Sequence, residues 1–388
     1  MMMTVPALRR FCFGLTLACL FTGIRSEAQK SKHATTVPTT HGYLIHNKAV
    51  DMSYLKTGPF VNLDDGGILT IEKNKSCISH DGGKTWKEYS IFQDSARFDI
   101  RIERVLLKTR SGAIILAFAN DVEKANWNWN NDIADSPEAT IPTYAIRSLD
   151  GGKTWQDLQK LHDEWTGANR DIIETKEGNI IFTSMMFRHN PGHHTVITYT
   201  SKNNGLNWIR SNVIDLGGVG HHSGVVESTL EQLKDGRIWM LMRTNWGVFW
   251  ETISENQGLT WKKFKPTKIA ASSAPGLLTR LASGRLFLVW NRPFPEGKDS
   301  FPLSGGDGIS SEVPHSNHRG ELSVMFSDDD GKSWSDPIVV ARVTDKSKGK
   351  NLAYPRVFER SPGEIWISTT YAAFGGYLSF KILEKDLL

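Results

Sequence analysis

Two carboxylates and a phenol recur at the same position of a repeated pattern in this chain of 388 residues. The pattern is marked by six glycines that each precede an alternating apolar run: Gly67, Gly112, Gly178, Gly236, Gly284 and Gly363. Counting nine residues back from these glycines gives Gly58, Glu103, Asn169, Glu227, Pro275 and Tyr354. A glutamate beside a tyrosine hydroxyl can accept its proton and make the phenol a nucleophile. Glu103, Glu227 and Tyr354 are therefore candidate site residues, although each taken alone fits a plain hydrogen-bonding role equally well.

A second repeat indicates the elements that position these residues. The sequence Ser-His-Asp-Gly-Gly-Lys-Thr-Trp at 79–86 recurs in similar form at 148–155 and 327–334, and in degenerate form at 201–208 and 254–261. Each copy of this box joins side-chain acceptors and glycine to a large aromatic residue. That combination favours a tight hairpin turn whose Trp fills a gap between neighbouring sheets.

The two repeats together predict an all-β fold, a six-bladed β-propeller over residues 42–388. A box follows each of the first five hairpins, and the sixth hairpin runs out at the C-terminus. The sixth blade is expected to take a strand from the segment Tyr43 to Met52, which closes the ring and leaves no open sheet edge. Because the first strand of each blade lines the central channel, Glu103, Glu227 and Tyr354 are expected to face one polar site.

These features resemble the bacterial sialidase (neuraminidase) superfamily over essentially the whole mature chain. The resemblance rests on the boxes, the six hairpins, the spacing from Glu227 to Arg243, and Tyr354 within Ala-Tyr-Pro-Arg-Val. It implies a propeller of the sialidase type and an exo-α-sialidase that releases terminal sialic or related acidic sugars without a cofactor. In that reaction Tyr354 attacks the anomeric carbon with Glu227 as its base, and sialidases are known for a tyrosine nucleophile.

The resemblance also implies three arginines that hold the carboxylate of the sugar, a group well suited to guanidinium forks. Arg243 and Arg319 match two of them. The third belongs to an Arg-Ile-Pro motif in the first blade, where this chain has Lys56-Thr-Gly-Pro59. The substitutes considered are Arg101 with Arg104 in the second blade and, as a rival, Arg170 in the third.

A general acid is expected from a loop early in the chain, as in the family. Residues 120–143 form a long loop with Asp135 as the first choice, Asp132 as the second, and Trp127 and Trp129 as stacking surfaces for a lid over the site. A solvated acidic loop is the alternative for both aspartates.

Two features fall outside the family pattern. His222, next to His221 and shortly before Glu227, is predicted to contact substrate hydroxyls. A metal is the less favoured role, because paired histidines without a third ligand are more often polar loop residues, and no metal is expected. The segment 291–318, rich in Pro and Gly, is predicted to be a rim loop that restricts which glycan enters.

The N-terminus predicts export to the periplasm or beyond the cell. Arg9 and Arg10 precede an apolar run at 11–23 and small residues at 26–28, so residues 1–28 read as a signal peptide and 29–41 as a flexible leader. A lipid anchor at Cys19 is the lesser alternative. Cys77 alone remains after the signal, so no internal disulfide is expected.

Composition argues against two classes of partner, and the resemblance implies glycans. The net charge of +4 comes without a basic stripe or zinc spacing, which excludes a nucleic-acid partner, and the apolar run is too short for stable membrane insertion. The expected partners are sialylated or other acidic glycans. Two other functions stay open: a glycosidase for another acidic sugar, such as a uronate or another nonulosonate, and a non-catalytic glycan-binding propeller.

Overall fold

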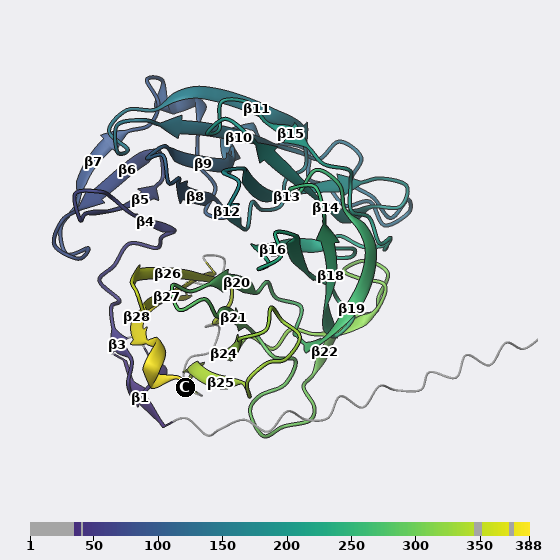
Figure 1. Cartoon of the computed structure of the whole chain (residues 1–388). Helices are drawn as coiled ribbons and strands as arrows, with labels where there is room; N and C mark the ends of the chain where they lie inside the picture. Colours follow the sequence, from purple (N-terminus) through teal and green to yellow (C-terminus); the bar gives the residue numbers. More distant parts are fainter. Residues whose placement is uncertain (1–34, 40–41, 345–350, 372–375) are drawn as a thin grey trace, which may run out of the picture.

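Six antiparallel sheets form a closed ring in the computed structural model, which describes residues 35–39, 42–344, 351–371 and 376–388 (Figure 1). The first blade contains β4 (Phe60–Asn62), β5 (Ile68–Glu72), β6 (Lys75–Ser79) and β7 (Lys87–Ser90). The second contains β8 (Val105–Lys108), β9 (Ile114–Ala119), β10 (Thr140–Ser148) and β11 (Gln156–Glu164). The third contains β12 (Ile172–Glu174), β13 (Ile180–Arg188), β14 (His193–Ser201) and β15 (Ile209–Arg210). The fourth and fifth contain β16 (Val226–Gln232), β17 (Ile238–Arg243), β18 (Val248–Ser254) and β19 (Lys262–Ala270), then β20 (Leu277–Arg280), β21 (Leu286–Trp290), β24 (Glu321–Ser327) and β25 (Ile338–Val343). The sixth contains β26 (Pro355–Ser361), β27 (Glu364–Tyr371), β28 (Gly376–Leu383) and β3 (Val50–Asp51). The predicted six-bladed propeller is confirmed.

The five boxes fold into the same turn. In the first box the amide of Gly83 donates to Ser79 Oγ at 2.9 Å, and the amide of Thr85 donates to Asp81 Oδ1 at 2.9 Å. The degenerate box at 201–208 keeps both bonds, with Asn203 in place of the aspartate. The turn therefore depends on a side-chain oxygen at that position, and Asn supplies it as well as Asp does.

The tryptophan that ends each box lies in the packing between its own blade and the preceding one. Trp261, only 1% exposed, packs among residues of the third and fourth blades, including Ile181 and Met240. The other box tryptophans occupy the corresponding interfaces: Trp86, Trp155, Trp208 and Trp334. This confirms the predicted role of the box as an inter-sheet wedge.

The N-terminal segment closes the ring, as predicted, through β3, which pairs with β28. Two preceding strands, β1 (Thr36–Pro38) and β2 (Tyr43–His46), extend the fifth blade beyond β25. Part of the predicted flexible leader, Thr36–Pro38, is thus a paired strand, because β2 offers it a free edge. The predicted signal peptide at 1–28 lies outside the described residues.

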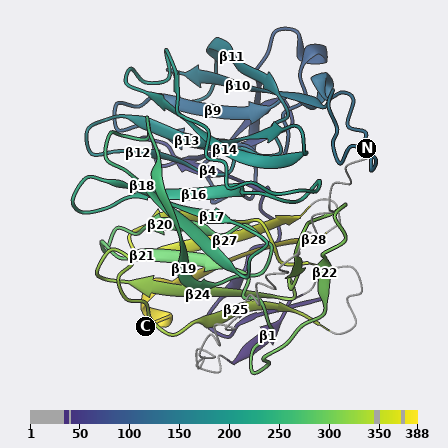
Figure 2. The same cartoon turned by 90° about the vertical axis from the view of Figure 1, so that its right-hand side faces the viewer.

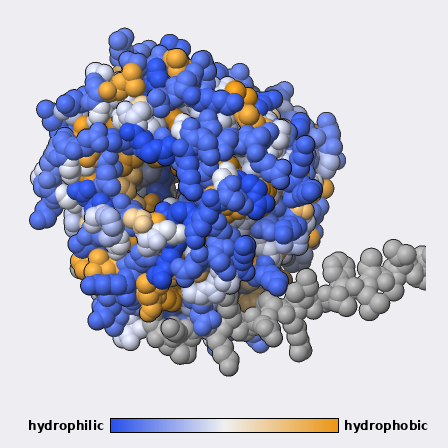
Figure 3. All heavy atoms as spheres, viewed as in Figure 1, coloured by the Kyte–Doolittle hydropathy of each residue, from blue (hydrophilic) through white to orange (hydrophobic). Residues whose placement is uncertain are grey.

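The predicted ring positions lie at or just before the first strand of each blade, and each first strand is an edge strand of its sheet. Figure 3 shows a hollow near the centre of the ring, bordered largely by hydrophilic residues. The described segments include three short 3-10 helices, Ser95–Arg97, Asp121–Glu123 and Glu384–Asp386, and contain no helix with the length and apolar character needed to cross a membrane. The long segment 291–318 carries an extra hairpin, β22 (Leu303–Gly305) with β23 (Pro314–Ser316), set apart from the blade sheets (Figure 2).

Candidate active site

The structure brings Tyr354 and Glu227 together from opposite parts of the sequence. Tyr354 directly precedes β26 of the sixth blade, and Glu227 lies in β16 of the fourth. The tyrosine hydroxyl hydrogen-bonds the glutamate carboxylate, and the two residues are only 8% and 9% exposed. The pair therefore has the contact that a base and its nucleophile need.

An unusual backbone holds both residues. Glu227 has φ +42° and Tyr354 has φ +57°, in the left-handed region that non-glycine residues rarely adopt. The pairing of β16 with β17 also shifts register between Val226 and Thr229, so a bulge turns Glu227 out of the regular alternation. Such local strain is concentrated at functional sites, where it fixes side-chain direction.

Arg243 binds the carboxylate of Glu227. It stands opposite Val226 across the β16–β17 pair, and its Nη1 forms a buried ion pair with Glu227. Its Nη2 donates to Ser273 Oγ at 2.9 Å. Burial alone would raise the pKa of Glu227, but Arg243 and the hydrogen bond from Tyr354 together hold that pKa below its ordinary value. Glu227 is therefore ionised near neutral pH.

Two further guanidinium groups flank the Tyr354 ring. The Cζ atom of Arg170 lies 5.5 Å from the ring centroid and that of Arg319 lies 5.8 Å from it. Arg319 also donates to the Ser273 carbonyl at 2.9 Å. Of the candidate third arginines, Arg170 is thus the one that the structure places beside Tyr354.

Burial and the charge of Glu227 raise the pKa of Tyr354, and the nearby Arg243 and Arg319 oppose that rise without cancelling it. The phenol is neutral at rest. It becomes a nucleophile only if its proton moves to Glu227 as the new bond forms.

Arg101 and Arg104 have other partners. Arg101 pairs with Asp121 at 2.7 Å, which balances its charge, and its Nε lies 3.2 Å from a carboxyl oxygen of Glu103. Arg104 donates to the carbonyls of Gly58 and Ile71 in the first blade. It ties the first two blades together. Its candidacy rests on the segment Arg101-Ile102-Glu103-Arg104, the nearest match to the Arg-Ile-Pro motif.

The structure also gives the predicted acids a different role. Asp135 is 1% exposed and accepts hydrogen bonds from the amides of Ser136 at 2.7 Å and Asn190 at 3.1 Å, while His189 contacts it at 2.9 Å. These contacts fasten the 120–143 loop to the following hairpin. Asp132 is exposed, and its amide donates to Asn130 within the loop.

The aromatic residues of the predicted lid pack against neighbouring rings. Trp127 contacts Trp165 with ring centroids 4.3 Å apart, and Trp129 meets the His221 ring edge-on at 5.6 Å. The Nδ1 atoms of His221 and His222 share a hydrogen bond. No third metal ligand joins these two histidines among the described residues.

His222 lies close enough to Arg243 to feel its charge, and its contact with substrate hydroxyls stays a prediction. Burial and then the charge of Arg243 lower its pKa to about 3, so the ring is neutral and can accept or donate one hydrogen bond. Its amide donates to the Ser310 carbonyl at 2.8 Å, so the histidine pair contacts the predicted rim segment 291–318.

Several residues near the site were not selected from the sequence. Burial, together with the charges of Arg243 and Arg319, lowers the pKa of His315 in β23. Asn245 accepts a hydrogen bond from Ser273 Oγ at 2.7 Å. Arg356 follows Tyr354 by two residues and is buried. The Tyr-Pro-Arg motif contained the signal for Arg356, whereas His315, in the extra hairpin, and Asn245, in the loop after β17, have no repeat to align them.

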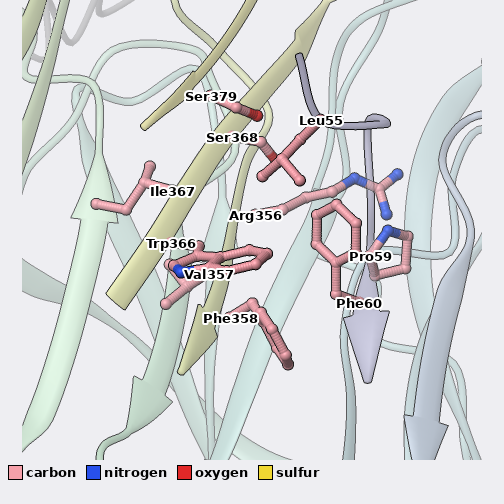
Figure 4. A pocket seen from close by; sticks show the side chains of 10 residues that line it. All are labelled: Leu55, Pro59, Phe60, Arg356, Val357, Phe358, Trp366, Ile367, Ser368 and Ser379. Atoms are coloured by element: carbon pink, nitrogen blue, oxygen red, sulfur yellow. The ribbon is translucent and has the colours of Figure 1, made fainter. Parts of the chain in front are cut away.

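The cavity in Figure 4 lies between the first and sixth blades, and its lining is mainly apolar, including Leu55, Phe60, Phe358 and Trp366. The Arg356 side chain extends beside Pro59 at its edge. The cavity is an inter-blade packing gap, because it has none of the carboxylates that surround Tyr354.

One group of three potential metal ligands occurs within the described ranges, and it consists of Glu72, Cys77 and Glu88. Lys56 pairs with both glutamates and Lys75 with Glu88, while burial raises the pKa of Cys77 to about 11. The lysines already balance this acidic group.

The fold and the site together define a propeller with a buried tyrosine–glutamate pair set among arginines. The sequence matches the model of the BNR repeat-like domain family over residues 75–367, and the chain belongs to that family. A search of curated proteins finds no significant match.

Solved structures with the same fold have several activities. The NanB sialidase of Streptococcus pneumoniae is 14% identical, with TM-score 0.51 and coverage of 95% of this chain and 70% of that chain. The GH93 α-L-arabinofuranosidase of Fusarium graminearum is 16% identical, with TM-score 0.53 and coverage of 88% and 99%. A Dyadobacter fermentans protein of unknown function is 17% identical, with TM-score 0.53 and coverage of 92% and 96%. At these identities the likeness establishes the fold, and substrate must be argued from the site.

Proposed function

We propose that this protein is a retaining glycoside hydrolase of the exo-α-sialidase type, which releases a terminal acidic sugar with Tyr354 as nucleophile and Glu227 as its base. The observation that supports this most directly is the buried hydrogen bond between the two side chains. The phenol attacks the anomeric carbon while its proton passes to Glu227, and a tyrosyl–sugar bond replaces the glycosidic bond. Water then cleaves that bond, and two inversions retain the configuration.

The arginines support an anionic sugar. Arg170, Arg243 and Arg319 surround Tyr354, and the carboxylate of Glu227 offsets one of the three charges. A substrate carboxylate next to the anomeric carbon would meet the remaining guanidinium groups through charge-assisted hydrogen bonds. An arabinose has no such group, so this site favours an acidic sugar over a neutral one.

The third arginine leaves room for a related substrate. It comes from the third blade, as Arg170, and the first blade has Lys56 where the family has its arginine. This shift supports, as the second candidate, a glycosidase for a uronate or another nonulosonate. We further propose that the protein is exported, on the basis of the N-terminal sequence.

Turnover of 4-methylumbelliferyl α-sialoside by the purified protein tests the proposal, and a panel of aryl glycosides of other acidic sugars tests the second candidate. Tyr354→Phe should lower kcat by at least about a thousandfold with unchanged thermal unfolding, because it removes the nucleophile and keeps the ring. Full activity in this variant would rule out the mechanism. If no acidic glycoside is cleaved but sialosides bind, the non-catalytic glycan-binding alternative holds.

A further inference from the structure

The proposed reaction needs a proton donor for the departing oxygen, and neither aspartate predicted for that role contacts the site. Both oxygens of Asp135 accept hydrogen bonds within the loop and its neighbour. Its side chain is 1% exposed, so a glycosidic oxygen has no access to it. Asp132 lies on the exposed part of the loop. Another acid must supply the proton.

We propose that Glu103 is the general acid and base of this site. This inference rests on the proposed function and names a further catalytic residue for it. Glu103 lies two residues before β8, at the second-blade position equivalent to Glu227 and Tyr354. Its charge is near enough to act on the phenol of Tyr354, and that of Glu227 acts on Glu103 in turn.

The backbone presents Glu103 at the tip of a tight turn. The amide of Arg104 donates to the carbonyl of Ile102 at 2.9 Å, a three-residue turn with Glu103 in the middle. The carbonyl of Glu103 accepts from the amide of Asn169 at 3.1 Å, so the third blade fixes it from the other side. A side chain at the apex of such a turn points away from the chain reversal.

Arg356 couples this turn to the nucleophile. From β26, two residues after Tyr354, its guanidinium donates to the carbonyls of Arg104, at 3.1 Å, and Ile102, which flank Glu103 on both sides. One buried side chain therefore joins the Glu103 turn directly to the strand that follows Tyr354. That arrangement suits two groups that must act on the same glycosidic bond.

The environment of Glu103 differs from that of Glu227 in the way that acid and base roles require. Its side chain is 19% exposed, so a substrate oxygen can reach it, and it pairs with Arg101 at 3.2 Å. Burial raises the pKa of Glu103 although the nearby charge of Arg101 opposes the rise, and the charge of Glu227 adds to it. Two carboxyls whose pKa values are pushed in opposite directions are the usual basis of an acid and base pair.

The proton balance closes over two steps. In the first, the glycosidic carbon–oxygen bond breaks as Tyr354 Oη bonds to the anomeric carbon, and the carboxyl of Glu103 gives its proton to the leaving alcohol. In the second, the carboxylate of Glu103 takes a proton from the attacking water, the tyrosyl–carbon bond breaks, and Glu227 returns the phenolic proton. Glycoside and water become free sugar and alcohol, and both glutamates regain their starting states.

Leaving-group dependence tests the assignment. With 4-methylumbelliferyl α-sialoside, whose phenolic leaving group needs little protonation, Glu103→Gln should slow the first step less than tenfold. With sialyllactose, whose leaving group is an alkoxide, the same variant should lose at least a hundredfold in kcat/KM. Azide should accelerate the variant on the aryl substrate and yield a sialyl azide of retained configuration, because azide attacks without a base.

Two control variants separate the possible outcomes. Asp135→Asn should change both substrates by the same factor, because it acts through the packing of the loop. If Glu103→Gln folds normally and affects both substrates equally, or neither, the inference is wrong while the proposed function stands on Tyr354→Phe. If the wild-type protein cleaves neither sialoside nor any other aryl glycoside of an acidic sugar, the proposed function and this inference fail together.

Discussion

At the scale of single residues, the low pKa of Glu227 predicts the acidic side of the pH profile. Glu227 works as a base only when ionised, and Arg243 holds its pKa below the ordinary value despite burial. Activity should therefore fall only when the pH drops below the usual range of a glutamate. Arg243→Ala removes the cation and raises the pKa of Glu227, so the acidic limb of kcat/KM should move to higher pH.

The pH profile of kcat/KM for Arg243→Ala, measured with the aryl sialoside, checks this shift. Arg237→Ala, on the same blade but exposed and paired with Asp235 at 2.8 Å, serves as the control and should leave the limb in place. An acidic limb that stays fixed in Arg243→Ala would show that Glu227 is not the base.

The basic side of the profile belongs to Glu103. A proton donor with a raised pKa is protonated below that pKa and loses its function as the pH rises through it. The groups that set this limb are Arg101, Glu227 and Arg356, which act on Glu103 in addition to burial. In Glu103→Gln the basic limb should disappear from kcat/KM for sialyllactose, the substrate whose leaving group needs the proton, whereas a limb at the wild-type pH would assign it to another group.

How much of the site could be predicted depended on the repeats. The repeat aligns Glu103, Glu227 and Tyr354, because each lies nine residues before its hairpin glycine. Strand pairing in each blade keeps this register. The sequence could not show the surroundings of Asp135, the predicted general acid, because the 120–143 loop has no repeat to align it. Its contacts with His189 and Asn190 are set by tertiary packing.

At the scale of elements, the fold was predictable because the box is a local structure. Its turn is made by side chains within five residues of one another, such as Ser148, whose Oγ accepts from Gly152 at 2.8 Å. The inner and outer order of strands then follows from chain order. The hairpin β22–β23 was not predicted, since its residues follow neither the box nor the hairpin pattern.

Two adjacent glycines of the second box test whether the turn sets the spacing between blades. Gly151 and Gly152 both have positive φ, +75° and +87°. A methyl group on Gly151 meets open space, but one on Gly152 would lie 2.0 Å from Leu69 Cδ1 of the first blade. Gly151→Ala should cost about 1 kcal/mol of unfolding free energy for backbone strain alone. Gly152→Ala should cost a further 1–3 kcal/mol, roughly, for overpacking.

Denaturant unfolding of both variants measures the difference. Equal losses would mean that the blades adjust freely and that the box does not fix their separation. Since neither glycine touches the site, the aryl sialosidase activity of the folded fraction should remain that of the wild type.

At the scale of the whole molecule, the N-terminal segment closes the ring by adding strands to both the fifth and the sixth blade. β3 supplies the outer strand of the sixth blade, the blade that carries Tyr354. β2 places Tyr43 and Ile45, 1% and 2% exposed, in the core between the fifth and sixth blades. The site therefore depends on residues far from it, because the two ends of the chain must meet before Tyr354 can face Glu227.

A series of N-terminal truncations tests this dependence. The chain from Gln29 keeps all three strands, the chain from Ala49 lacks β1 and β2, and the chain from Ser53 also lacks β3. Loss of two large buried side chains costs roughly 2–5 kcal/mol each, so the midpoint of thermal unfolding should fall clearly at Ala49. It should fall again at Ser53, together with the activity, because the sixth blade then has an unpaired edge and the ring is open. A chain from Ser53 as stable and active as the chain from Ala49 would show that five complete blades and a three-stranded sixth are enough to hold Tyr354 against Glu227.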